Sequence, residues 1–259
     1  MARAKQLIGK IMRSKGEVFT VADAAICLDL SSEDTAKTLA RWAKQGWLIR
    51  LKRGLYAVVA IDASSTERVL AEPWVLIPQL FKSCYVGGWS AAEHWGLTEQ
   101  IFYDICVVSD SARVKKIQRV QNINFVATKV SSERLFGSKV IWKNNTKVMV
   151  SDPHKTIVDM LYDPRLGGGI QHVVDCFREY QQSEYRDFIK LGDYAERMRS
   201  GAILKRLGFL AERDLGREHV LTTFCAKALS QGNAYLDPKQ KGGRLITRWR
   251  LLVPDSYKE

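Results

Sequence analysis

Residues 31–56 combine a short amphipathic helix, a glycine stop and two short strands joined by a basic tripeptide. Ser31 and Ser32 are good helix N-caps, and the acidic residues that follow them suit the positive end of the helix dipole. We therefore expect a helix that begins near Glu33. Gly46 is placed to end this helix, because glycine adopts the left-handed conformation of a C′ residue without steric cost.

The expected helix has one apolar face and one basic face. Helical spacing groups the apolar residues Ala36, Leu39, Ala40 and Ala43 on one side and the basic residues Lys37, Arg41 and Lys44 on the other. Residues 47–51 and 55–59 are rich in β-forming residues, and Lys52-Arg53-Gly54 between them suits a tight hairpin. This order of elements is typical of a winged helix-turn-helix.

Two further helices are expected before this segment. Residues 3–14 form the first, whose inward residues are Leu7, Ile8, Ile11 and Met12. Thr20 and Asp23 have the spacing of a capping box before a second helix that ends at Leu28. In a helix-turn-helix the last of these helices lies in the major groove with its N-terminal half at the base edges. The first 60 residues therefore predict a DNA-binding module.

The distribution of charge agrees with this placement. Residues 1–60 contain 11 Lys and Arg against 5 Asp and Glu, so that they carry half of the net charge of +12 of the 259-residue chain. Basic side chains that neutralise phosphates release counterions, which favours binding to DNA.

The predicted DNA contacts fall into two groups. Major-groove contacts are expected from Ser32, Thr35, Lys37, Thr38 and Arg41, with Lys37 or Arg41 facing guanine, whereas Lys44, Lys52 and Arg53 are expected at phosphates or in the minor groove. Trp42 and Trp47 are expected to support the core and the hairpin rather than to stack on bases. A palindromic operator requires two copies of the module, and because the chain has no heptad repeat we expect monomers in solution that pair on DNA.

The remaining residues predict an α+β domain with a helical later half. We expect a domain at 1–60, a polar linker at 61–71 and a second domain at 72–259. The expected helices are 72–82 (kinked or divided by Pro78), 89–97, one that starts at Asp152-Pro153, 170–182, 184–197, 200–207 and 213–229. The expected strands are 103–108, 119–130, 139–150, 234–236 and 245–253.

No catalytic, metal or cofactor site is predicted. The five cysteines are scattered and are expected to be buried apolar residues, and the four histidines have no ligand spacing. Gly137-Ser138 resembles the start of a nucleotidyltransferase motif, but no Asp-x-Asp follows. Asp104, Glu133, Asp152 and Lys155 would be the residues of a restriction-type nuclease, although Asp152 and Lys155 are better explained as the start of a helix. With no apolar run long enough to cross a bilayer and no apolar leader, we expect a cytoplasmic protein without a membrane contact.

Three segments resemble the AbiEi antitoxins. They are the wing RLKRGLY at 50–56, GGWSAAEHWGLT at 87–98 and VSDPHKTIVD at 150–159. The resemblance implies a bacterial antitoxin of an AbiE-type abortive-infection system whose N-terminal winged helix represses its own operon at inverted repeats. It also implies that the C-terminal domain counteracts a separate nucleotidyltransferase toxin, with direct binding to that toxin left open. No residue of an antitoxin surface follows from it.

Two other functions stay open at this point. One is a winged-helix regulator whose second domain senses a ligand, and the other is the DNA-targeted nuclease.

Overall fold

The N-terminal part of the chain forms three helices and a three-stranded sheet. The structure, a computed structural model, describes residues 2–59, 72–112, 115–120 and 122–257. The elements are α1 (Ala2–Lys15), β1 (Val18–Thr20), α2 (Val21–Leu28), α3 (Ser32–Lys44), β2 (Leu48–Lys52) and β3 (Leu55–Val58). This arrangement confirms the winged helix-turn-helix. Strand β1 was not predicted; it pairs antiparallel with β3 and completes the sheet in the order β1-β3-β2.

Local signals in the sequence set the ends of these helices. The capping box at α2 is present: the backbone amide of Asp23 donates to Thr20 Oγ1 at 3.1 Å and that of Thr20 to Asp23 Oδ2 at 2.9 Å. The core of the winged helix includes Ile11, Leu39 and Trp42, all buried. Trp42 is therefore a core residue, as predicted.

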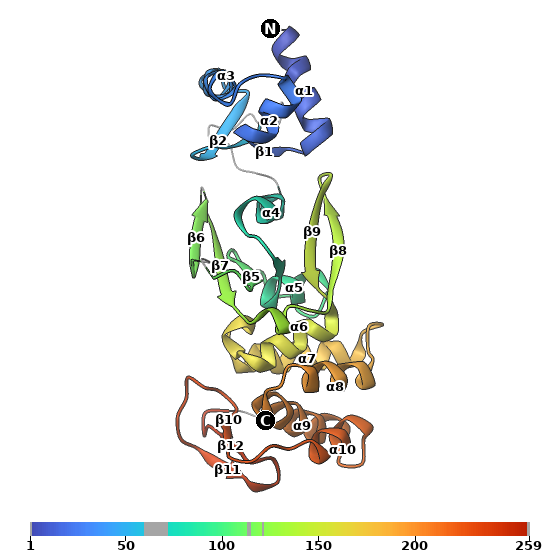
Figure 1. The fold of residues 1–259 in the computed structure, drawn as a ribbon. Coiled ribbons are helices and arrows are strands. Elements are labelled where there is room, and N and C mark those ends of the chain that lie inside the picture. The colour runs from blue at the N-terminus through green and yellow to red at the C-terminus, as the bar shows by residue number, and fades with distance from the viewer. Residues whose placement is uncertain (1, 60–71, 113–114, 121, 258–259) are drawn as a thin grey trace.

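A mixed six-stranded sheet forms the centre of the molecule (Figure 1). Its strands are β4 (Cys84–Val86), β5 (Ile105–Ser109), β6 (Ile117–Val120), β7 (Ile123–Lys129), β8 (Ser138–Lys143) and β9 (Thr146–Ser151), in the order β6-β7-β5-β4-β9-β8. The predictions of single strands at 119–130 and 139–150 are wrong, because each region is a hairpin. At the second, Asn144 and Asn145 have φ of 43° and 63°, which suits the turn of a two-residue hairpin.

Helices cover one face of this sheet and continue away from it. They are α5 (Gly88–His94), α6 (Pro153–Tyr162), α7 (Ile170–Gln182), α8 (Phe188–Arg197), α9 (Gly201–Leu215) and α10 (Val220–Lys227), with short 3₁₀ turns η2 (Ser132–Arg134) and η3 (Pro164–Gly167). The predicted helices 200–207 and 213–229 are corrected, since α9 continues to Leu215 and the break lies at Gly216, where φ is 92°. The helix expected at 72–82 is divided into the 3₁₀ turn η1 (Pro73–Leu76) and α4 (Ile77–Leu80), so that the break precedes Pro78, which lies in the first turn of α4.

A second small sheet lies at the end of the molecule opposite the winged helix (Figure 1). Its strands are β10 (Ala234–Tyr235), β11 (Arg244–Ile246) and β12 (Leu251–Val253), in the order β10-β12-β11. The single strand expected at 245–253 is interrupted by the 3₁₀ turn η4 (Thr247–Trp249) and by Arg250 in the left-handed conformation. The fold is thus α+β with a helical later half, as predicted.

The winged helix packs directly against the central sheet. Val18 and Leu55 share a buried apolar cluster with Ile77, and Asn144 Nδ2 donates to Glu17 Oε2 at 3.2 Å. The linker expected at 61–71 lies outside the described residues. Within the described ranges, no helix has the length and apolar character needed to span a membrane.

Candidate DNA interface

Helix α3 begins and ends at the residues that the sequence indicates. Ser31 is its N-cap, with Oγ accepting from the backbone amide of Asp34 at 3.1 Å. The helix starts at Ser32, and Gly46 follows its end with φ of 83°. The N-cap and the glycine fix the length of α3 and therefore the number of side chains that it presents to solvent.

The basic face of α3 is turned to solvent. Ser32, Lys37, Arg41 and Lys44 are exposed and Thr38 is half-buried. Lys37 Nζ pairs with Glu33 Oε1 at 2.8 Å, one turn earlier on the same exposed face. Because the side chain of Lys37 is 70% exposed, this surface pair is weak and leaves the lysine available.

The prediction that Thr35 contacts DNA is wrong. Its side chain is completely buried, and its Oγ1 has no hydrogen-bond partner. Thr35, Leu39 and Trp42 are the buried residues of α3, so the inward face is centred on the 35–39–42 line rather than on the alanines. Thr35 therefore cannot reach a base edge from this position.

The hairpin of β2 and β3 presents the other predicted basic residues. Lys52 and Arg53 are exposed at its tip, where Gly54 has φ of 79° and open space beside it. Pairing shifts register between Arg50 and Lys52, which marks a bulge beside the turn. Arg50 is also exposed on β2, and the predicted set omitted it.

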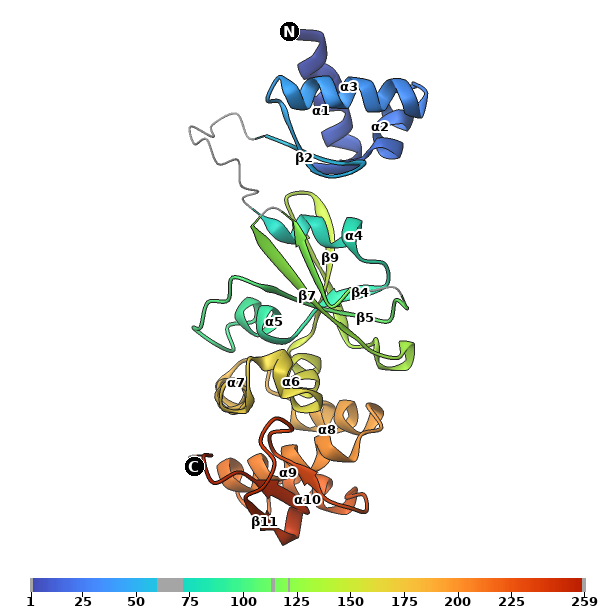
Figure 2. The ribbon, with the colours of Figure 1, turned by 90° about the vertical axis from the view of Figure 1, so that its left-hand side faces the viewer.

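Helix α3 and the hairpin face the same side of the molecule. Both lie on the left of the winged helix in Figure 1 and toward the viewer in Figure 2, in which α3 runs across the long direction of the molecule. The central domain contacts the winged helix through α4 and through the tip of the β8–β9 hairpin, and Leu55 at the base of the wing belongs to the apolar cluster between them. Helix α3 and the wing therefore lie together on one side of the winged helix, and we call their exposed basic residues the α3–wing surface.

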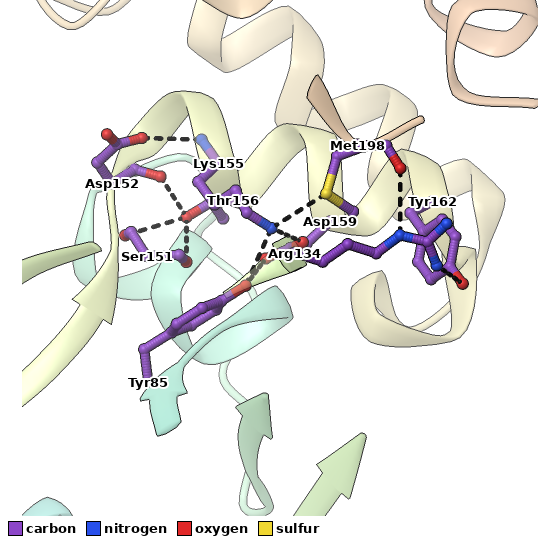
Figure 3. A network of polar contacts seen from close by, with 9 residues as sticks. All are labelled: Tyr85, Arg134, Ser151, Asp152, Lys155, Thr156, Asp159, Tyr162 and Met198. Carbon is purple, nitrogen blue, oxygen red and sulfur yellow. Dashed lines mark hydrogen bonds and ion pairs between the residues drawn. The ribbon is translucent and has the colours of Figure 1, made fainter. Parts of the chain in front are cut away.

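A second set of polar residues lies within the fold at helix α6. Lys155 is completely buried, and its Nζ forms an ion pair with Asp159 and donates to Tyr85 Oη at 3.0 Å (Figure 3). Tyr85 Oη in turn donates to Asp159 Oδ2 at 2.8 Å. Burial raises the pKa of Asp159 above its ordinary value, against the opposing effect of Lys155. This arrangement is a closed structural triad, with Met198 Sδ at 3.5 Å from Nζ.

The residues of the nuclease alternative have separate partners. Asp152 caps α6 and accepts from Tyr194 Oη at 3.0 Å, while Lys155 points into the buried triad. Asp104 accepts from Asn124 Nδ2 at 2.9 Å, and Glu133 lies 3.6 Å from Arg199 Nη1. A metal nuclease needs paired carboxylates beside an available lysine, and Lys155 is not available.

The five cysteines lie mostly in the interior of the protein. Cys27, Cys106, Cys176 and Cys225 are buried, and Cys84 is half-buried, which corrects the expectation for that residue. Burial raises the pKa of Cys84 to about 12, so its thiol stays protonated at neutral pH. Among the described residues, no group of His, Cys, Asp and Glu is arranged to hold a metal ion.

The fold resembles a solved structure over almost its whole length. The RV2827C protein from Mycobacterium tuberculosis aligns with a TM-score of 0.66 at 16% sequence identity, over 98% of this chain and 92% of that one. At this identity the likeness shows a shared fold. No curated protein matches the sequence.

A family model identifies the N-terminal segment. The model described as "Transcriptional regulator, AbiEi antitoxin" matches residues 10–59, which run from α1 to the end of β3. The segments 87–98 and 150–159 that also carry the resemblance lie outside this match. Over residues 10–59, the chain is therefore similar to transcriptional regulators of the AbiEi antitoxin type.

Proposed function

We propose that the protein is a DNA-binding autorepressor and an antitoxin that counteracts a nucleotidyltransferase toxin. The observation that carries the repressor part is the α3–wing surface: Lys37, Arg41 and Arg53 are exposed, and the two elements that hold them, α3 and the β2–β3 hairpin, lie on the same side of the molecule. The major groove of DNA is wide enough to admit an α-helix, and a neighbouring wing then meets the backbone or the minor groove. The family match supports the antitoxin part.

Binding would replace protein contacts on α3 by contacts with DNA. Lys37 is paired with Glu33 in the free protein, and a phosphate or a guanine edge offers it a stronger partner. Ser32, Thr38 and Arg41 complete the proposed groove contacts, and Lys44, Lys52 and Arg53 the proposed contacts with the backbone. Thr35 is omitted because it is buried.

Two substitutions test this assignment on the promoter of the protein's own operon. Arg41→Ala removes a proposed base contact and should reduce discrimination among operator variants by about 1–3 kcal/mol, whereas Arg53→Ala should weaken binding to all sequences alike. The control is Lys227→Ala, which removes an exposed lysine from α10 at the far end of the molecule. Gel shifts in which both arginine variants bind like the control would contradict the proposal.

We further propose that two copies pair on an inverted repeat and are monomers before binding. Two-fold operators place identical modules at half-sites about one helical turn apart. Sedimentation velocity measures the mass of the free protein directly. A stable dimer without DNA would contradict the proposed order of assembly.

The antitoxin role is tested in cells that express the neighbouring toxin gene. The full chain should restore growth, and the double variant Lys37→Ala/Arg41→Ala should restore it equally when both are expressed from an unrelated promoter. This comparison separates antitoxin action from repression, because the variant changes only the α3–wing surface. Failure of the full chain to rescue growth would contradict the antitoxin role.

We propose no enzymatic activity and a cytoplasmic location, where operator DNA is present. The nuclease alternative predicts instead that the protein cleaves DNA in the presence of a metal ion and that Asp152→Ala abolishes this cleavage. Observation of such cleavage would overturn our proposal.

A ligand-sensing regulator is the second candidate, and one observation favours it. A cavity of about 330 Å³ lies beside α5 and is lined by Trp74, His94, Phe102 and other residues. Its volume is at the lower end of the range for small-molecule binding sites. A metabolite screen in which promoter affinity changes, and in which His94→Ala removes the change, would favour this candidate.

A further inference from the structure

The outer hairpin of the central sheet is strongly basic. Residues 111–130 contain five Lys and Arg and no Asp or Glu. Strand β6 is at the edge of the sheet, and Lys115, Lys116 and Lys129 are exposed at one end of the β6–β7 hairpin. We call these three lysines the β6–β7 patch.

The lysines of the patch differ from those at the opposite edge of the same sheet. At β8, Lys143 forms an ion pair with Glu72 at 3.3 Å and lies over the Trp74 ring, and Lys139 lies over the Trp95 ring. Within the described part of the chain, the three patch lysines have no ion pair and no ring contact. No acidic side chain in the described ranges neutralises their positive charge, so these lysines would attract an anionic partner.

The β6–β7 hairpin lies on the same side of the molecule as α3 and the wing. In Figure 1 the β6–β7 hairpin lies below β2 at the left, and β8 lies at the right. In Figure 2 both α3 and β7 are turned toward the viewer. The two basic surfaces therefore follow one another along the long direction of the molecule.

The direction of α3 determines whether a bound DNA duplex passes the β6–β7 patch. A helix that follows the major groove lies across the duplex axis, and α3 lies across the long direction of the molecule (Figure 2). A duplex held by α3 would therefore run lengthwise, past the wing and on to the sheet. The edge strand β6 would face its backbone.

We propose that the β6–β7 patch binds the phosphate backbone of the same duplex that the α3–wing surface engages, further along the DNA. This inference rests on the proposed DNA-binding function and extends its footprint beyond the winged helix. The patch adds affinity but no sequence discrimination, because lysine contacts with phosphates are alike for all base pairs.

The salt dependence of binding tests this extension. Fluorescence anisotropy of the full chain on a promoter duplex of about three helical turns gives the slope of log K against log salt concentration, which changes by about 0.9 for each phosphate contact. Lys116→Ala/Lys129→Ala should lower the magnitude of that slope by about 2 and weaken binding about 10- to 100-fold near 0.1 M salt. Discrimination among operator variants should not change.

A control with the same change in charge completes the design. Lys147→Ala/Lys227→Ala removes two exposed lysines from β9 and α10, away from the proposed DNA path, and should keep the parental slope. Equal slopes for the two double variants, with the parent binding normally and Arg41→Ala weakened, would overturn the patch and leave the repressor proposal intact. A parent that does not bind the promoter would overturn both.

Discussion

Helices α3 and α6 share local features but have opposite environments. Each is capped by a side chain that accepts from the third backbone amide after it, Ser31 in α3 and Asp152 in α6. Each also has a lysine paired with an acid four residues away. The Glu33–Lys37 pair of α3 is exposed, whereas Lys155 and Asp159 of α6 are completely or almost completely buried.

The difference shows that tertiary packing, not spacing, decides what such a pair does. An exposed pair is worth a few tenths of a kcal/mol and is easily exchanged for another partner. A buried pair must remain satisfied, because an isolated charge in the interior is costly. Helix α3 therefore has charges available for recognition, while the charges of α6 are committed to the fold.

The largest expected effect is on the buried pair. Lys155→Ala leaves Asp159 buried without its cation and should lower the free energy of unfolding by about 3–5 kcal/mol. Urea denaturation of the full chain measures it. The double variant Lys155→Met/Asp159→Leu, which removes both charges, should recover most of this loss. A double variant as unstable as Lys155→Ala would show that the triad contributes more than charge balance.

The exposed pair should behave in the opposite way. Lys37→Ala should change the free energy of unfolding by less than about 0.5 kcal/mol but cost about 1–3 kcal/mol in promoter binding if Lys37 contacts a base. Glu33→Gln removes the competing carboxylate and should strengthen binding. Anisotropy titrations measure both effects, and tighter binding by Lys37→Ala would contradict the assignment.

The pH dependence of stability should separate the two regions. Burial lowers the pKa of His154 in α6 below its ordinary value, so the unfolded chain takes up the proton first. Stability should therefore fall as the pH decreases below about 6.5. His154→Gln should reduce this dependence, measured as urea midpoints at neutral and mildly acidic pH.

The winged helix provides an internal control, because residues 1–60 contain no histidine. Hydrogen exchange at mildly acidic pH should increase around α6 before it increases in α3. Earlier opening of α3 would contradict this explanation of acid sensitivity.

The smallest expected effect concerns Thr35. Thr35→Val replaces a buried hydroxyl that has no partner and should stabilise the protein by about 0.5–1 kcal/mol. Promoter affinity should be unchanged, since the side chain does not reach the surface. Ser32→Ala is the exposed comparison on the same helix, and a loss of binding by Thr35→Val would restore the original assignment.

Most of the winged helix could be predicted because its signals are local. The Thr20–Asp23 capping box, the Ser31 cap and Gly46 each act within a few residues and fix the ends of α2 and α3. Strand β1 could not be predicted from its three residues, since it exists only through its pairing with β3. The same holds for β4, which lies between β5 and β9.

The burial of individual polar residues was not predictable. Helical spacing alone left the position of the inward face of α3 uncertain by about one residue, which decides whether Thr35 faces DNA or the core. Lys155 and Asp159 have the spacing of an ordinary surface pair, and only the packing of α6 beneath the sheet buries them. The Asn144-Asn145 turn is the exception, since its residue types were a usable signal for a hairpin.

Hydrogen exchange with and without the promoter fragment shows which segments of the protein DNA protects. We expect slower exchange in residues 32–44 and 48–58 on adding the fragment, with α6 unchanged at the same DNA concentration. Unchanged exchange in both of these segments, under conditions in which the DNA is bound, would contradict the assignment of the α3–wing surface as the DNA interface.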